Sequence, residues 1–197
     1  MVGATWPKNR EARDTIGVLT MTERGLVSCP NPSTAFLGAR DVTAPGSAIA
    51  AAIQGNRTML VEVQALIARS AMGIPQRRTI GIDVNRLHVF LAVLAARGGV
   101  ALGSSDVHVV THGGLRVTDT GADLAVLAAL ASAAADRPVP FDVCIGAVGL
   151  DGSVRAVPGM ERRVHDAVRL GYRRIAAPPD APRPTGAVVT ELPNVRA

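Results

Sequence analysis

Arginine side chains crowd into one short stretch of this sequence, residues 155–174. The stretch holds Arg155, Arg162, Arg163, Arg169, Arg173 and Arg174. A guanidinium group presents a planar fork of hydrogen-bond donors that matches phosphate oxygens. On a helix of 3.6 residues per turn, Arg162, Arg169 and Arg173 can share one outward face. The spacing therefore predicts a surface that binds nucleic acid through its phosphates.

Arginines elsewhere extend the predicted nucleic-acid surface. Arg57 falls in an expected hairpin turn, and three further arginines fall in expected loops or at strand ends. The full predicted set is Arg57, Arg69, Arg77, Arg78, Arg155, Arg162, Arg163, Arg169, Arg173 and Arg174. With one Trp, one Tyr and three Phe, base stacking is disfavoured, so we expect contact with the backbone of a duplex. The alternative is a solvated basic face, or ion pairs with Glu161 and Asp166.

Lysine is nearly absent, and this excludes one common phosphate chemistry. Of the 21 basic residues only Lys8 is a lysine, and it lies between Pro7 and Asn9. A P-loop needs Gly-Lys-Ser/Thr after a glycine-rich turn. The chain has no such motif, and we expect no ATP hydrolysis by it alone.

Metal, triad and thiol chemistry find little support. His108 and His112 fall in a strand-to-loop stretch, where a rise of about 3.3 Å per residue separates them by about 13 Å. Ser104, Ser105, Asp106 and His112 are better explained by a polar loop than by a triad, because adjacency in sequence does not create a triad. Cys29 and Cys144 lack metal spacing and are expected to be buried thiols.

The elements of the first half are predicted to be mainly strands. We expect a strand at 16–21, a boundary at 41–47, and a hairpin of strands 48–53 and 59–67. In the second strand alternate residues from Met59 face inward, with Glu62 and Gln64 on the polar face. A strand at 77–82 precedes a helix capped by Asp83, with Val84, Leu87, Leu91 and Leu94 inward, that ends at Gly98 and Gly99.

The second half alternates strands and helices. We expect strands at 107–110, 143–148, 175–177 and 187–192, with a loop at Gly113 and Gly114. A helix over 122–135 has almost no polar face and must be buried on most sides. A second helix over 160–170 places Met160, Val164, Ala167 and Val168 inward and a basic face outward. The pattern predicts an α/β (α+β) fold with a mixed sheet and packed helices.

Composition and length fit a globular protein with either one domain and an appendage or two small domains. The chain has 197 residues, of which 48% are hydrophobic and 19% charged, and its net charge is +5. No run of about 18 apolar residues is present, and residues 1–13 carry charged groups where a signal peptide is apolar. We therefore expect a cytoplasmic location and no membrane partner.

Several short motifs, in order, resemble the bacterial RadA (Sms) family of recombination proteins. They are residues 60–66, 81–86, 122–125, 136–138, 148–150, 154–155 and 161–163. Two longer stretches, residues 111–130 and 144–174, resemble the peptidase core of the Lon family. Upstream, Lys8, Asn9 and Arg10 are similar to the start of a Lys-Asn-Arg-Phe-Gly motif at the end of the RadA ATPase core. Glu11 and Ala12 replace its last two residues, which puts coupling to ATP in doubt.

The resemblance implies the domain plan and partners. Residues 1–45 would be the tail of a RecA-like ATPase core, and residues 46–197 a Lon-protease-like domain, with the fold type named after the second domain of a ribosomal protein. It implies duplex or branched DNA and a homohexameric ring as partners, with a recombinase as a further possible one. ATP, magnesium and zinc would belong to an N-terminal part outside this sequence. Apolar residues that could lie at ring contacts, or complete the monomer core, are Met72, Ile74, Leu150 and Val157.

The resemblance also implies that peptidase activity is lost. The Lon serine matches Gly121, and the Lon lysine, which must take the proton of the serine, matches Glu161. Thr120 is a conceivable stand-in nucleophile, but no lysine accompanies it. We therefore expect a DNA-binding and ring-forming domain without proteolysis. The alternatives are a protein-interaction scaffold without DNA binding and a residual serine or threonine peptidase.

Overall fold

A long antiparallel hairpin forms the centre of the fold. The computed structural model describes residues 19–23, 25–28, 33, 37, 43–55, 57–70 and 73–196. Strand β3 (Ser47–Gln54) pairs with β4 (Arg57–Arg69) over its whole length, from Ser47 opposite Gln64 to Gln54 opposite Arg57. The predicted hairpin is confirmed, and both of its strands are longer than the pattern indicated.

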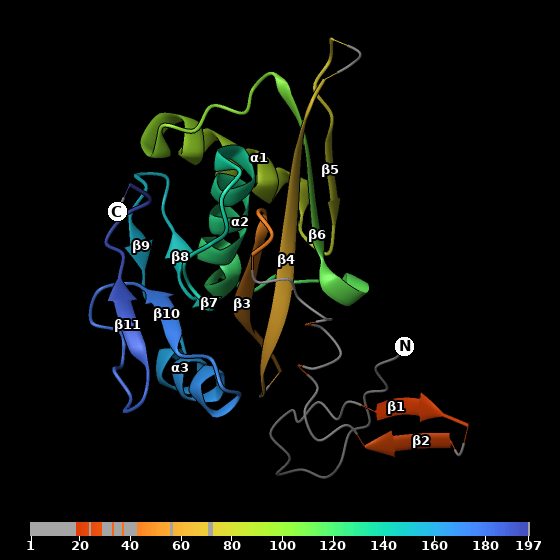
Figure 1. The fold of residues 1–197 in the computed structure, drawn as a ribbon, viewed down its shortest axis with the longest axis vertical. Coiled ribbons are helices and arrows are strands. Elements are labelled where there is room, and N and C mark those ends of the chain that lie inside the picture. The colour runs from red at the N-terminus through yellow and green to blue at the C-terminus, as the bar shows by residue number, and fades with distance from the viewer. Residues whose placement is uncertain are drawn as a thin grey trace.

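Five further strands extend this hairpin into a mixed seven-stranded sheet with the order β11-β10-β7-β3-β4-β6-β5 (Figure 1). They are β5 (Arg77–Ile80), β6 (Ser105–Thr111), β7 (Val143–Cys144), β10 (Arg174–Ala177) and β11 (Val188–Glu191). Strand β4 is antiparallel to β3 and β6, and all other neighbours in the sheet are parallel. The predicted mixed α/β fold is confirmed.

Helices cover both faces of the sheet around β3. On one face, Ala48, Ala50 and Ala52 belong to the core formed with α1 (Val84–Val93) and α2 (Asp123–Ala135). On the other face, Ile49 and Ala51 belong to the core formed with α3 (Met160–Arg169). Alternate residues of a strand point to opposite faces, so β3 is buried on both sides between these helices (Figure 1).

Helix α1 begins and ends as predicted, and of its predicted inward residues Leu87 and Leu94 are buried and Leu91 packs against the core. The Asp83 carboxylate accepts hydrogen bonds from the backbone N–H groups of Asn85 (2.9 Å) and Arg86 (3.1 Å). The chain continues as a π-helical turn, Leu94–Gly98, and Gly99 ends it with a φ of 73°. Leu87, Phe90 and Val93 are buried, whereas Val84 in the first turn is exposed. The prediction that Val84 faces inward is wrong, because the buried stripe of the helix runs through Leu87, Phe90 and Val93.

Helix α2 is buried on most sides, as its composition predicted. Ser132, its one hydroxyl residue, is also buried and fully used. Its Oγ accepts a hydrogen bond from the Gly46 N–H (2.8 Å) and donates one to the Arg137 carbonyl (2.5 Å). The last turn of α2 is thereby fixed to the residue that precedes β3.

Two sequence predictions about the sheet are wrong. The expected strand 143–148 divides at Gly146 into β7 and β8 (Ala147–Val148), and β8 pairs with β9 (Val154–Arg155) in a separate hairpin. A Cβ at Gly146 would lie 2.9 Å from Val154 Cγ1, so only glycine allows this close approach. Glu62 is buried rather than exposed, because the Ser47 hydroxyl (2.7 Å) and the Gln64 amide (3.1 Å) donate hydrogen bonds to its carboxylate.

The described N-terminal residues form a small hairpin of β1 (Leu19–Thr22) and β2 (Gly25–Ser28). Residues 19–21 of the strand expected at 16–21 are confirmed, and residues 16–18 lie outside the described residues. Lys8, Asn9, Arg10, Cys29 and Met72 also lie outside them, as does part of the expected boundary at 41–47. Within the described part of the chain, no helix has the length and apolar character needed to cross a membrane.

Candidate nucleic-acid surface and degenerate catalytic site

Gly121 lies in a short 3-10 turn, Thr120–Ala122, immediately before α2. Asp119 caps this turn by accepting a hydrogen bond from the Gly121 N–H (2.9 Å). Gly121 is buried, and a Cβ at this position would lie 2.8 Å from Arg163 Cζ and still closer to Arg163 Nη1. The position predicted to match the Lon serine therefore has no room for a hydroxyl group while Arg163 keeps this conformation.

Arg163 fills this space from α3, and its side chain is only 2% exposed. Its two terminal nitrogens bind the two carboxylate oxygens of Asp119, Nη2 at 3.1 Å from Oδ1 and Nη1 on Oδ2. Nη1 also donates to the Ala51 carbonyl, and Nε donates to the Pro158 carbonyl (3.2 Å). A fork of this kind satisfies a buried guanidinium group and joins α3, β3 and the turn before α2.

The Asp119 carboxylate has a full set of partners. Besides Arg163, it accepts hydrogen bonds from the backbone N–H groups of Ile53 (2.6 Å) and Gly121 (2.9 Å). Burial raises the pKa of Asp119, but the Arg163 hydrogen bond, the two backbone N–H groups and the Arg163 charge outweigh burial and lower it below 3.8. Asp119 is thus held as a carboxylate, with no acid or base role left for it.

A second arginine and aspartate pair supports the same turn. Arg86 of α1 binds Asp123 at the start of α2, and it donates hydrogen bonds to the carbonyls of Asp119 (2.8 Å) and Val117 (3.2 Å). Its guanidinium lies 5.6 Å from the centre of the Phe90 ring. The turn around Gly121 is therefore held from both sides.

Glu161, which matches the Lon lysine, lies on the exposed side of α3. Residues two apart on a helix are separated by about 200° around its axis, so Glu161 and Arg163 face opposite ways. Thr120 is exposed in the 3-10 turn. Among the described residues no side-chain amine is present to accept a proton from it, because none is a lysine.

Sequence reasoning missed the position of Arg163, although the helical pattern contained it. Arg163 follows Met160 by three residues and precedes Ala167 by four, so it falls on the same stripe as these inward residues. Met160, Val164 and Ala167 are buried as predicted, and Val168 is half-buried. The burial of Arg163 removes it from the predicted nucleic-acid contacts.

We call the exposed arginines of residues 155–174 the α3 arginine surface. Its members are Arg155, Arg162, Arg169, Arg173 and Arg174. Arg162 and Arg169 lie on the outward stripe of α3 together with His165. Arg173 lies beyond the end of the helix at Arg169, so the expected helical face is continued by the loop before β10.

Aspartates partly neutralise the α3 arginine surface. Arg155 pairs with Asp151 (2.9 Å), Arg169 with Asp166 (3.1 Å) and Arg174 with Asp142 (2.7 Å). The hydrogen bonds from Ser153 and Arg155 lower the pKa of Asp151 to about 2. The expected alternative of ion pairing is confirmed for Asp166, and these exposed pairs remain open to exchange with phosphate.

The remaining predicted arginines lie outside α3, on β4 and β5. Arg57 and Arg69 lie at opposite ends of β4, about 40 Å apart at a rise of about 3.3 Å per residue. Arg78 on β5 is exposed near the Arg69 end, since both β5 and that end of β4 pair with β6. Arg77 is half-buried, and its guanidinium donates to the carbonyls of Gln76 (3.0 Å), Leu102 (2.9 Å) and Gly103 (3.2 Å), which occupies its donors.

The other candidate residues also have assigned places. His108 is half-buried on β6, and His112 lies in the 3-10 turn that follows. Ser105 and Asp106 lie in strand β6, so the expected polar loop is wrong for these two residues, and Asp106 accepts a hydrogen bond from the Gln76 N–H (2.8 Å). In the described ranges no group of three or more His, Cys, Asp or Glu residues could hold a metal ion. Cys144 is buried, as predicted.

The apolar residues considered for assembly divide into two kinds. Ile74 and Leu150 are 72% and 74% exposed, so they are available to a partner. Val157 is buried in the core with α3 and completes the monomer. Met72 lies outside the described residues.

Comparison with known proteins finds relatives of one kind. No family model matches the chain. The DNA repair protein RadA of Escherichia coli is 43% identical over 173 residues, which cover 87% of this chain and 38% of the relative. The DNA repair proteins RadA of Brucella abortus (43% over 166 residues, 84% of this chain and 36% of the relative) and Bacillus subtilis (40% over 173 residues, 87% and 38%) are similar too. The chain spans about two fifths of the length of these relatives, and it is similar to the C-terminal part of the RadA proteins.

Proposed function

We propose that this chain is a DNA-binding, ring-forming domain of a RadA-like DNA repair protein, built on a Lon-type fold whose catalytic site is closed. The relatives are named as DNA repair proteins, and this supports a role in repair. The observation that carries the proposal is the contrast on α3. Arg163 points inward and fills the nucleophile position, while Arg162 and Arg169 point outward.

The absence of peptidase activity follows from chemistry at Gly121. A Lon-type mechanism needs a hydroxyl nucleophile with an amine within hydrogen-bond reach. At the matched positions the chain has Gly121 and Glu161, and the Arg163 guanidinium occupies the space between α3 and Gly121. An arginine does not lose its proton in proteins, so Arg163 cannot replace the lysine as a base.

The proposed DNA contact is the α3 arginine surface. Its five side chains are exposed on neighbouring segments, and three of them exchange an aspartate for phosphate on binding. Because phosphate contacts carry no sequence information, binding is independent of base sequence and falls steeply with salt.

The proposed domain begins at residue 46. Gly46 supports this boundary, since its N–H is bonded to Ser132 and its carbonyl accepts from the Ala65 N–H (2.7 Å) just before β3. Residues 1–45 would belong to a preceding ATPase core, and ATP, magnesium and zinc would bind outside residues 46–197. The exposed Ile74 and Leu150 are the proposed contacts between subunits of the ring.

A titration of fluorescein-labelled duplex DNA tests this proposal. Affinity is measured by anisotropy at about 50 mM and about 200 mM salt. The triple variant Arg162→Ala, Arg169→Ala, Arg173→Ala should bind at least about tenfold more weakly at the lower salt concentration. The slope of log affinity against log salt should fall by about 2 to 3, since each phosphate contact contributes about 0.9.

The matched control is the double variant Arg69→Ala, Arg78→Ala at the far end of β4. It removes two exposed arginines that lie outside the α3 arginine surface, and it should change the affinity for duplex DNA by less than about threefold. Unchanged binding of the triple variant, or an equal loss in both variants, would contradict the α3 arginine surface as the DNA contact.

A protein-interaction scaffold without DNA binding is the second candidate. It is favoured by the ion pairs that neutralise three of the five arginines and by the exposed Ile74 and Leu150. Such a scaffold would show no duplex affinity at about 50 mM salt, yet would form an oligomer in light scattering. The two measurements together separate the candidates.

A further inference from the structure

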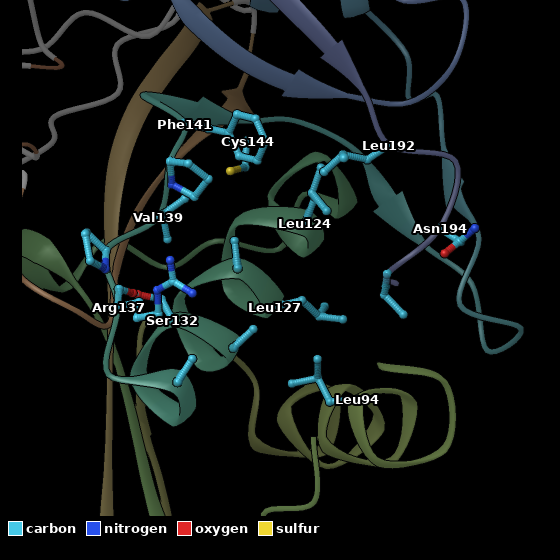
Figure 2. Close-up of a pocket in the computed structure, with 16 residues that line it drawn as sticks. Leu94, Leu124, Leu127, Ser132, Arg137, Val139, Phe141, Cys144, Leu192 and Asn194 are labelled. Atoms are coloured by element: carbon cyan, nitrogen blue, oxygen red, sulfur yellow. The ribbon is translucent and has the colours of Figure 1, made fainter. Parts of the chain in front are cut away.

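A cavity of about 470 Å³ lies between α2, the π-helical turn after α1 and the residues that follow β11 (Figure 2). Leu94 and Leu192 line it from two of these elements, and Leu124 and Leu127 line it from α2. Its size falls within the range of about 300 to 1,000 Å³ typical of ligand sites. The cavity belongs neither to the Gly121 site nor to the α3 arginine surface, because none of their residues lines it.

The lining between Arg137 and Asn194 is mainly apolar, and its one buried hydroxyl group already has partners. The Ser132 hydroxyl is held by Gly46 and by the Arg137 carbonyl. The Ala128 and Ala131 side chains on the outer part of α2 are too small to fill the cavity. The space therefore suits large apolar side chains of another molecule, which would bury the exposed parts of this lining.

Positive charges stand at both ends of the cavity. Arg137 lies at one side, opposite Asn194 (Figure 2). Beyond Asn194 and Val195, a second hollow of about 260 Å³ continues past Arg97 and Arg196. Within the described part of the chain, none of these three arginines forms an ion pair, and the nearby Asp151 is already paired with Arg155. An occupant with carboxylates on either side of an apolar centre would match these charges.

We propose that this cleft binds an acidic peptide segment of a partner protein. Large apolar side chains of the segment enter the cavity, and its carboxylates contact Arg137 at one end and Arg97 or Arg196 at the other. An extended peptide advances about 3.3 Å per residue, so a few residues join the two hollows. DNA is a poor occupant, because the lining between the arginines offers no partners for a continuous row of phosphates.

Selection of random twelve-residue peptides displayed on phage, against the immobilised whole chain, tests the proposal. The selected peptides should carry two large apolar residues flanked by Asp or Glu. Fluorescein-labelled copies are then titrated by anisotropy against the wild type, Arg137→Glu, Ala131→Trp and the control Arg78→Glu. We expect the affinity for the peptide to fall at least about tenfold in Arg137→Glu, as for loss of one charge-assisted contact. A similar loss is expected in Ala131→Trp, because the indole ring fills the cavity, and the affinity of the control should stay within about twofold of the wild type.

Arg137→Glu is the safer of the two variants, because Arg137 is exposed and its side chain makes no hydrogen bond in the described structure. The proposal is overturned if no peptide is enriched or if the selected peptides lack acidic residues. It is also overturned if the peptides bind Arg137→Glu with the same affinity as the wild type. Loss of self-association in Arg137→Glu would assign the cleft to a second copy instead. Duplex DNA binding of Arg137→Glu should be unchanged, so failure here is distinguishable from failure of the DNA proposal.

Discussion

The inner and outer faces of α3 carry the same residue type with opposite consequences. Arg163 is 2% exposed and joins Asp119 and the carbonyls of Ala51 and Pro158, whereas Arg169, on the outer face, is 71% exposed and pairs only with Asp166. An inward arginine bound to four acceptor atoms stabilises the fold, whereas an exposed arginine can exchange its partner at a small cost in free energy. The number of arginines on a helix therefore does not measure its capacity to bind phosphate.

Arg163→Ala should produce the largest effect, on stability. It leaves Asp119 as a buried carboxylate without its guanidinium partner, and breaking a buried pair in this way costs about 3 to 5 kcal/mol. Urea unfolding followed by circular dichroism measures the change in free energy. Arg162→Ala, the adjacent outward residue, is the matched control and should change the free energy by less than about 0.5 kcal/mol. Equal losses of unfolding free energy in the two variants would contradict the difference between the inner and outer faces of α3.

Gly121→Ser should have the next largest effect. The new Cβ meets Arg163, so the guanidinium must shift, at a cost of about 1 to 3 kcal/mol in the free energy of unfolding. In the double variant Gly121→Ser, Arg163→Ala the two costs should be less than additive, because the clash is relieved. The control Thr120→Ser changes an exposed neighbour and should be neutral. Additive costs in the double variant would show that Arg163 does not occupy the nucleophile position.

Acid should weaken the inner face through Asp119. Its folded pKa lies below 3.8, so the ionised carboxylate stabilises the folded protein fully above the unfolded pKa. This contribution is lost as the pH falls through the folded pKa. The free energy of unfolding should therefore decline between about pH 5 and about pH 2 more steeply in the wild type than in Asp119→Asn. Identical slopes would contradict the coupling of Asp119 to Arg163.

Regular patterns allowed much of this fold to be predicted from sequence. The inward side of β4, the Asp83 cap and the apolar composition of α2 each depend on neighbours in sequence, and each is confirmed. Glu62, Gly146 and Arg163 were predicted wrongly because their environments come from distant residues. Ser47 satisfies Glu62 across the hairpin, Val154 crowds Gly146, and Asp119 lies 44 residues from Arg163.

The same contrast between local patterns and distant contacts applies to the candidate site, of which only part could be predicted from the sequence. Gly121 and Glu161 were found by their motifs, and the exposed arginines of α3 by their spacing. Charge alone gave no way to separate Arg77, whose donors are held by carbonyls, from Arg78 beside it. The apolar cavity of α2 is lined by residues from three distant stretches, so no local pattern predicts it.

One paired measurement tests the central claim most directly. Urea unfolding and duplex DNA titration are carried out on Arg163→Ala and on Arg162→Ala, Arg169→Ala, Arg173→Ala, under conditions where circular dichroism shows both to be folded. We predict that Arg163→Ala loses stability and keeps its DNA affinity, while the triple variant keeps stability and loses affinity. A triple variant that binds DNA like the wild type, or an Arg163→Ala variant that is as stable as the wild type but loses DNA binding, would contradict it.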